Sequence, residues 1–243
     1  MKCLFLVAGY ATRLYPLTEN FPKSLLTVSG KTILDHLIDN IEETKMVDGY
    51  VLVSNSKFYS IFKKWTETRK ENIEVIDDGT WTNETRLGAV NDIQFAISKL
   101  NIDDDLLVLA GDNLVDFSFG KFIDFFYSKG STCVMRYCEE NFSKRTKSAV
   151  MVVDDTDRVL DFQEKPSNPK SQWCSPPFYL YTKEDVKKIK IALKEGCSSD
   201  APGSFIAWLF DKSAVYAYKM NGMRYDIGDL NSYEQVKRIF EGK

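Results

Sequence analysis

The chain has 243 residues, of which 44% are hydrophobic, and its 32 Lys and Arg against 35 Asp and Glu give a formal net charge of −3. A chain of this length buries about 70% or more of its unfolded surface, and without a dense Lys/Arg stripe it lacks the electrostatic footprint of a nucleic-acid-binding protein. The longest apolar run near the N-terminus, residues 3–8, is far shorter than the roughly 20 residues that span a bilayer. We therefore expect a cytoplasmic protein that has neither a nucleic acid nor a membrane as its partner.

The first half of the chain alternates short β-branched or aromatic runs with longer helical patterns, which is typical of βαβ units. We expect strands at residues 2–8, 50–54, 73–76 and 106–110 and helices at residues 32–45, 57–70 and 84–100. The first and fourth strands are nearly all apolar, which is typical of strands that are covered on both faces of the sheet. The pattern predicts an α/β fold with a doubly wound, mixed but mostly parallel sheet of the Rossmann-like type.

The second half continues with one more helical pattern near residues 119–126 and then with strands that follow each other closely. Expected strands cover 132–137, 149–153, 158–162, 178–181 and 214–220, an expected loop covers 163–177, and expected helices lie near 186–193 and 229–241. Because no linker or internal repeat interrupts the chain, we expect a single domain over residues 1–243.

Cysteine and histidine usage limits the chemistry. Five scattered cysteines without a C-x-x-C pair indicate reduced, structural thiols. The one histidine, His36, falls on the polar side of a helical pattern that includes Leu37 and Ile41, so we expect it to be solvated. Catalysis by Ser-His-Asp or Cys-His groups and multi-histidine zinc sites are therefore not expected.

A loop with the features of a phosphate site follows the first strand. Gly9, Ala11, Thr12 and Arg13 lie at the carboxyl end of that strand, and Lys23 comes shortly after them. Ligands of α/β sheets bind at this edge. Free backbone N–H groups together with the two cationic side chains suit an anion such as a triphosphate.

Charged residues at three later positions complete the candidate set. Asp112 directly follows the apolar strand at 106–110, and Asp226 stands before Ile227 and Gly228. Two carboxylates near a phosphate loop can hold Mg²⁺ against phosphate oxygens, whereas either one alone can equally be a turn or cap residue. Lys165, which follows Glu164, can offer a fixed ammonium to a second phosphate, although most lysines beside a proline are surface residues.

Taken in chain order, these segments resemble the sugar-phosphate nucleotidyltransferase family, the group that includes glucose-1-phosphate thymidylyltransferase. The resemblance covers nearly the whole chain and is carried by residues 9–13, 22–23, 111–113, 164–166 and 226–228. Its most specific part is the opening, where a first strand runs into G-x-G-T-R-x-x-P-x-T and then P-K, here with Ala11 at the second glycine. The resemblance implies a short form without the β-helix tail that some members carry.

The resemblance also implies a reaction and a role for each matched residue. The reaction is a Mg²⁺-dependent transfer of a nucleotidyl group from a nucleoside triphosphate to a sugar 1-phosphate, which releases pyrophosphate and forms an NDP-sugar. A nucleotide-binding half at 1–115 and an acceptor-binding half at 116–243 are implied. The implied nucleotide-binding residues are Ala8, Gly9, Ala11, Thr12, Arg13, Leu87, Gly88 and Asp112. The implied catalytic residues are Arg13, Lys23 and Asp112. The implied acceptor-binding residues are Glu164 and Lys165, and the implied metal ligands are Asp112 and Asp226.

The chain departs from the family pattern in the acceptor-binding half. The run Ser148-Ala149-Val150-Met151 replaces the usual Tyr-Gly-Val-Val, and Pro177 stands where a glycine usually precedes an aromatic strand. Since those glycines leave room for a sugar ring, the same chemistry on a non-sugar phosphate, such as phosphocholine or a polyol phosphate with a CDP-type product, is an alternative.

Two further hypotheses use the same type of fold. A glycosyltransferase that uses a nucleotide-sugar donor usually carries a D-x-D metal motif. It is disfavoured here because the D-x-D spacings, at 103–105 and 155–157, fall in expected turns. A non-catalytic nucleotide or sugar-phosphate sensor is disfavoured because Arg13, Lys23, Asp112, Lys165 and Asp226 are retained together. The base, the acceptor and the assembly into a homo-oligomer, which is frequent in the family, stay open.

Overall fold

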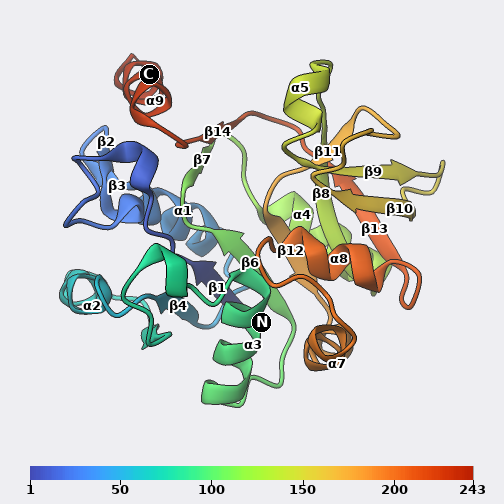
Figure 1. The fold of residues 1–243 in the computed structure, drawn as a ribbon, viewed down its shortest axis with the longest axis horizontal. Helices are drawn as coiled ribbons and strands as arrows, with labels where there is room; N and C mark the ends of the chain where they lie inside the picture. The colour runs from blue at the N-terminus through green and yellow to red at the C-terminus, as the bar shows by residue number, and fades with distance from the viewer. Residues whose placement is uncertain (243) are drawn as a thin grey trace. The chain divides into compact units, whose positions relative to one another are not determined.

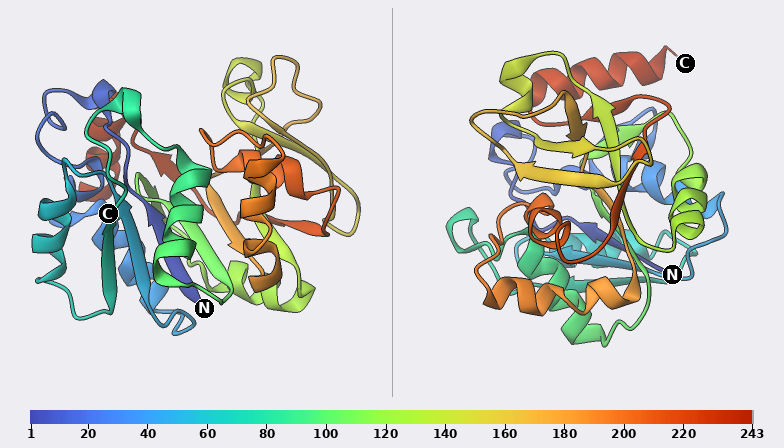
Figure 2. Two further views of the ribbon diagram at one scale, coloured as in Figure 1. Left: turned by 60° about the horizontal axis from the view of Figure 1, so that its bottom comes forward. Right: turned by 90° about the vertical axis from the view of Figure 1, so that its right-hand side faces the viewer.

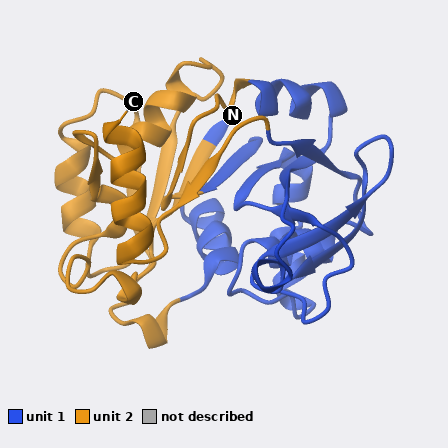
Figure 3. Ribbon diagram, turned by 90° about the horizontal axis from the view of Figure 1, so that it is seen from above, with its two compact units in different colours: residues 1–2, 87–109, 121–220 blue, residues 3–86, 110–120, 221–243 orange. Residues whose placement is uncertain are grey.

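A computed structural model describes residues 1–242, and Figure 1 labels its helices and strands. The chain divides into two compact units, which are coloured separately in Figure 3. Unit 1 comprises residues 1–2, 87–109 and 121–220, and unit 2 comprises residues 3–86, 110–120 and the segment from 221 onward. The units interleave along the chain, so their content differs from the sequential halves 1–115 and 116–243.

Parallel strands form the sheet of unit 2. β1 (Lys2–Leu6) pairs with β4 (Tyr50–Ser54), and β4 pairs with β5 (Ile73–Asp77). All five residues of β4 are buried, as expected for a strand covered on both faces. Because the three strands run in the same direction, their carboxyl ends lie at one edge, where the loop at residues 7–13 begins.

The helices of unit 2 begin at recognisable caps. α1 (Ile33–Glu42) starts after Thr32, whose side chain accepts a hydrogen bond from the Asp35 N–H in a capping box. α2 (Tyr59–Thr66) follows β4 and packs on β5. The C-terminal helix α9 (Leu230–Glu241) lies beside β2 (Figure 1), where the Tyr233 hydroxyl donates to the Thr27 carbonyl at 2.8 Å.

Short elements complete unit 2 and were not expected from the sequence. They are the strands β2 (Thr27–Val28), β3 (Lys31–Thr32), β7 (Asn113–Val115) and β14 (Arg224–Asp226) and the 3₁₀ turns η1 (Thr12–Leu14), η2 (Lys23–Leu25) and η3 (Asn83–Thr85). β2 pairs with β3, and β7 pairs with β14, in both cases antiparallel.

Unit 1 holds a mixed sheet in which antiparallel pairs dominate. Its strands are β6 (Leu106–Ala110), β8 (Thr132–Cys138), β9 (Ala149–Val153), β10 (Val159–Glu164), β11 (Trp173–Ser175), β12 (Phe178–Tyr181) and β13 (Val215–Lys219). β12 joins β6 to β8, β11 joins β8 to β9, and β10 pairs with β9, all antiparallel, whereas β13 runs parallel to β8. The strands β9, β10 and β11 lie side by side in the right-hand view of Figure 2, in yellow to gold.

The helices of unit 1 pack on this sheet and on one another. They are α3 (Ala89–Leu100), α4 (Gly120–Lys129), α5 (Phe142–Arg145), α6 (Lys183–Val186), α7 (Ile189–Lys194) and α8 (Gly203–Leu209). α3 contacts α7, α7 contacts α8, and α8 contacts β10. The contact between α8 and β10 brings the chain around Gly203 next to the end of β10.

The α/β fold with parallel and antiparallel pairing is confirmed, but several elements differ from expectation. α6 and α7 replace the one helix expected near 186–193, and α5 and α8 were not expected. The helix expected from residue 84 begins at Ala89, because Gly88 has a φ of 91° that no helix accommodates. The helix expected at 57–70 spans only Tyr59–Thr66. The loop expected at 163–177 contains β11, because a strand of three residues shows no periodic pattern of its own.

Candidate active site

The loop after β1 offers unpaired backbone donors. The N–H groups of Gly9, Ala11, Thr12 and Arg13 have no hydrogen-bond acceptor within residues 1–242. Ala11 has φ 48° and ψ 42°, a left-handed conformation that glycine adopts with less strain. The buried Thr18 donates from its hydroxyl to the Ala11 carbonyl at 2.8 Å and holds the loop in this shape. Free donors at the carboxyl end of a parallel strand suit phosphate oxygens.

Lys23 and Asp112 form an ion pair in unit 2. The Lys23 Nζ donates to Asp112 Oδ2 at 2.6 Å and to the Ile227 carbonyl at 2.9 Å. Burial by itself raises the pKa of Asp112, but the Lys23 ammonium and the Arg224 guanidinium outweigh it, and the pKa lies below its ordinary value. Asp112 is therefore an ionised carboxylate near neutral pH.

The ribbon of β7 and β14 brings Asp226 beside Asp112. Asp226 stands opposite Asn113, and the Ile227 N–H donates to the Asp112 carbonyl at 3.1 Å. Burial, and then the negative charge of Asp112, raise the pKa of Asp226. Two carboxylates that repel each other in this way become more stable together when a cation lies between them.

The donor atoms of this carboxylate pair fit a hard divalent cation. Mg²⁺ binds through oxygen ligands, commonly one or two carboxylates together with substrate phosphates and water. No group of three or more His, Cys, Asp or Glu side chains in residues 1–242 is arranged to hold a metal ion. A cation held by Asp112 and Asp226 would need further ligands, which a phosphate-bearing substrate and water can supply.

A chain of hydrogen bonds links Arg224 through Asn113 to Asp112, and the sequence did not indicate it. Arg224 Nη1 donates to Asn113 Oδ1 at 2.7 Å, and Asn113 Nδ2 donates to Asp112 Oδ1 at 2.6 Å. Arg224 Nη1 also lies 3.8 Å from Asp226 Oδ1. Asn113 was visible in the Gly-Asp-Asn run, but no local signal identifies Arg224, since its contact depends on the pairing of β7 with β14.

Glu164 and Lys165 lie at the end of β10 in unit 1. The Lys165 N–H donates to the Ser148 carbonyl at 3.1 Å, and Lys165 has a positive φ of 46°. Its Nζ lies 4.0 Å from Asp200 Oδ2, and both side chains are more than half exposed. Burial raises the pKa of Glu164, and the Lys165 charge only partly opposes this.

Leu87 and Gly88 precede α3, also in unit 1. The positive φ of Gly88 favours glycine, and a Cβ at this position would lie 2.5 Å from the Ser199 carbonyl oxygen. The same carbonyl accepts a hydrogen bond from the Val90 N–H at 3.0 Å. Gly88 thus lies against the segment that also carries Asp200.

The expected site residues therefore form two groups. Ala8, Gly9, Ala11, Thr12, Arg13, Lys23, Asp112 and Asp226 belong to unit 2, and Leu87, Gly88, Glu164 and Lys165 belong to unit 1. The first group combines cations, free N–H groups and paired carboxylates, and the second places a partly buried carboxylate next to an exposed ammonium. A family model described as "Nucleotidyl transferase" matches residues 2–242.

The chain belongs to the nucleotidyl transferase family. Among its relatives, a glucose-1-phosphate adenylyltransferase of Fervidobacterium nodosum is 28% identical over 95% of this chain and 59% of its own length. The bifunctional protein GlmU of Methanocaldococcus jannaschii is 31% identical over 100% of this chain and 57% of its own. The chain thus spans less than two thirds of the length of these relatives.

A solved structure shows the same fold. It is described as a UDP-glucose pyrophosphorylase complexed with UDP-glucose, and it superposes with a TM-score of 0.83 at 16% identity over 99% of this chain and 98% of its own. The α/β nucleotidyl transferase fold is therefore shown. None of the helices in residues 1–242 has the length and apolar composition that a transmembrane span requires.

In this nucleotidyl transferase, an alanine stands directly across from Glu164. Ala149 on β9 is the register partner of Glu164 on β10 and of Ser175 on β11. Residues directly opposite each other in an antiparallel pair project on the same side of the sheet. The methyl group that replaces the usual glycine hydrogen therefore lies on the same face as the Glu164 side chain.

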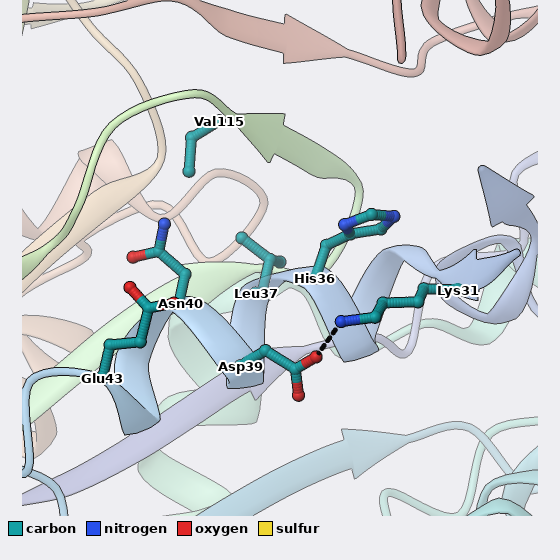
Figure 4. A pocket seen from close by; sticks show the side chains of 7 residues that line it. All are labelled: Lys31, His36, Leu37, Asp39, Asn40, Glu43 and Val115. Atoms are coloured by element: carbon teal, nitrogen blue, oxygen red, sulfur yellow. Dashed lines mark hydrogen bonds and ion pairs between the residues drawn. The ribbon is translucent and has the colours of Figure 1, made fainter. Parts of the chain in front are cut away.

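A hollow of about 210 Å³ in unit 2 lies along α1 (Figure 4). It is lined by Lys31, His36, Leu37, Asp39, Asn40, Glu43 and Val115. His36, which we expected to be solvated, is only partly exposed. Its Nε2 lies 2.9 Å from the Val28 carbonyl oxygen, and its ring packs edge-on against Phe240. Lys31 pairs with Asp39 at 2.7 Å. None of the expected site residues lines this hollow.

Proposed function

We propose that this chain transfers a nucleotidyl group from a nucleoside triphosphate to a sugar 1-phosphate, with release of pyrophosphate. The observation that carries the proposal is the Lys23–Asp112 pair, at 2.6 Å, with Asp226 held beside it by the β7–β14 ribbon. An ammonium and two carboxylates next to a loop of free N–H groups are suited to a metal-bound triphosphate.

In the proposed reaction, an acceptor phosphate oxygen forms a bond to the α-phosphorus of the triphosphate. The bond from the α-phosphorus to the oxygen that bridges to the β-phosphorus breaks, and pyrophosphate leaves with that electron pair. An acceptor phosphate is already ionised at neutral pH, so the reaction needs no general base. Positioning and charge neutralisation therefore account for catalysis.

The residues of unit 2 supply this neutralisation. The N–H groups of Gly9, Ala11 and Thr12 bind phosphate oxygens, and Arg13 compensates the charge of the departing pyrophosphate. Lys23, held in place by Asp112 and the Ile227 carbonyl, binds the phosphates at the reacting centre. When bound by Asp112 and Asp226, Mg²⁺ supplies further neutralisation as a Lewis acid.

The acceptor is assigned to unit 1. Lys165 binds the acceptor phosphate, Glu164 accepts hydrogen bonds from the acceptor hydroxyls, and Leu87 and Gly88 contact the base. The name of the Fervidobacterium relative, a glucose-1-phosphate adenylyltransferase, supports a sugar 1-phosphate as acceptor and a nucleoside triphosphate as donor.

A non-sugar phosphate, such as phosphocholine or a polyol phosphate, is the second candidate acceptor. The observation that favours it is the register of Ala149 opposite Glu164, which adds a methyl group on the face of that carboxylate. A smaller acceptor without a sugar ring loses less from this methyl group.

Pyrophosphate release with Mg²⁺ tests the proposal. Each common nucleoside triphosphate is combined with pooled hexose 1-phosphates or with pooled non-sugar phosphates, and the products are identified by mass spectrometry. Release with the hexose pool supports the leading proposal, and release only with the non-sugar pool supports the second acceptor class. Triphosphate binding without turnover in any pool contradicts both and supports a sensor.

A further inference from the structure

Gly203 lies directly against the carboxylate of Glu164. Gly203 is the first residue of α8, which packs on β10, and Glu164 is the last residue of β10. A Cβ built on Gly203 would overlap Glu164 Oε2 and would lie 3.3 Å from the Glu164 carboxyl carbon. The Glu164 carboxylate therefore occupies the space that any other residue at position 203 needs for its side chain.

The segment that leads into Gly203 contacts the acceptor residues a second time. Asp200, three residues before Gly203, reaches within 4.0 Å of Lys165 Nζ through its Oδ2. Asp200 and Gly203 both belong to unit 1, as do Glu164 and Lys165. One short segment thus lies against both residues to which the acceptor is assigned.

We propose that Gly203 is a positioning residue for the acceptor, because its missing side chain sets where the Glu164 carboxylate lies. The proposal rests on the proposed function, in which Glu164 accepts hydrogen bonds from the acceptor. Gly203 itself contacts neither the acceptor nor the reacting atoms; it acts through Glu164.

The positioning role of Gly203 can be told apart from a structural role by the atoms that a Cβ at this position would meet. The atom that a Cβ would meet is the far end of a flexible side chain, which can rotate to another conformation. The Phe162 ring, whose Cε1 would lie 3.3 Å from the Cβ, needs to shift by only a few tenths of an ångström. Gly203→Ala is therefore expected to move the Glu164 carboxylate while the fold remains intact.

Steady-state kinetics of Gly203→Ala test the proposal. We expect the KM for the acceptor to rise about tenfold, the KM for the triphosphate to stay the same and the Tm not to fall. Gly120→Ala is the matched control, since Gly120 is also the first residue of a helix and a Cβ there would approach nothing closer than Ser118 Oγ at 3.4 Å. This control is expected to leave both KM values unchanged.

A double-mutant cycle shows whether Gly203 acts through Glu164. In a Glu164→Ala background the carboxylate is absent, so Gly203→Ala is expected to cause no further change in the acceptor KM. An unchanged acceptor KM in Gly203→Ala, or an equal rise in KM with and without Glu164, would overturn the proposal.

The titration of Glu164, followed by NMR of its carboxyl carbon, is a readout that does not depend on turnover. Burial raises the pKa of this carboxyl, so its displacement toward solvent in Gly203→Ala is expected to lower the pKa. An unchanged pKa would show that the carboxylate has not moved and would overturn the positioning role. If the wild-type chain transfers no nucleotidyl group, the proposed function fails, and the titration still decides whether Gly203 sets the position of Glu164.

Discussion

The region of unit 2 to which we assign the triphosphate and the region of unit 1 to which we assign the acceptor are built in different ways. In unit 2, Lys23, Asp112, Asn113 and Arg224 are joined by hydrogen bonds of 2.6 to 2.7 Å, and Asp226 is held by strand pairing. In unit 1, the exposed Lys165 approaches Asp200 only to 4.0 Å. The reaction chemistry is thus assigned to a tightly connected group, and acceptor recognition to a looser one.

The difference in hydrogen bonding between the two regions matches their different tasks in the proposed reaction. Charge neutralisation at a triphosphate requires groups held in fixed positions, because a small displacement weakens electrostatic stabilisation. Ala149, which departs from the family pattern, lies in unit 1, whereas the departure in unit 2, Ala11, lies in the phosphate loop. The variants below are expected to affect catalysis when they lie in unit 2 and acceptor binding when they lie in unit 1.

Removal of divalent cations is expected to have the largest effect. With EDTA in excess, pyrophosphate release should fall by about 10³-fold or more, since the repulsion between Asp112 and Asp226 is then uncompensated and the triphosphate loses a counter-charge. Added Mg²⁺ in excess of EDTA should restore the rate. Undiminished release in EDTA would contradict the assignment of a cation to these two carboxylates.

Asp112→Asn and Asp226→Asn are expected to lower kcat by about 10²- to 10³-fold. The amide removes a negative charge at the proposed cation, and in Asp112→Asn it also deprives Lys23 of its ionic partner at 2.6 Å. Circular dichroism should show an unchanged fold. Asp103→Asn, at an exposed residue of unit 1, is the matched control and should keep full turnover. Full activity in both site variants would exclude them as metal ligands.

Arg224→Ala is expected to lower kcat about tenfold, an effect typical of a residue that orients a metal ligand. Without the guanidinium, Asn113 loses the donor at 2.7 Å that orients its amide toward Asp112. The KM for the acceptor should stay the same, and Arg224→Lys should recover part of the rate. Arg158→Ala, which removes an exposed arginine of unit 1, is the control. A change in acceptor KM alone would place Arg224 in acceptor recognition instead.

Ala149→Gly is expected to have the smallest effect, confined to the acceptor. Removal of one methyl group opposite Glu164 should lower the KM for hexose 1-phosphates by about threefold, which is less than the roughly 10- to 200-fold that one methylene contributes in a closed hydrophobic pocket. The triphosphate KM should not change. A glycine inside a strand costs about 0.5–1 kcal/mol, so the Tm should fall by a few degrees. Unaltered selectivity would show that this methyl group does not define the acceptor.

The amino-acid sequence alone determined the parts of the site that depend on neighbouring residues. The apolar run of β1 predicts where the phosphate loop begins, and the apolar run of β6 predicts that Asp112 stands at a strand end. Such features are readable because a strand or helix of five or more residues carries its own periodic pattern and boundary signals.

Only the tertiary structure decided the contacts between distant segments. The three-residue strands β7 and β14 show no periodic signal. Their pairing nevertheless places Asp226 beside Asp112 and lets the Arg224 guanidinium donate to the Asn113 side chain. The place of Gly203 under Glu164 likewise depends on how α8 packs on β10. Register and packing are decided by the burial and hydrogen bonding of both partners at once, and neither partner's local sequence contains that information.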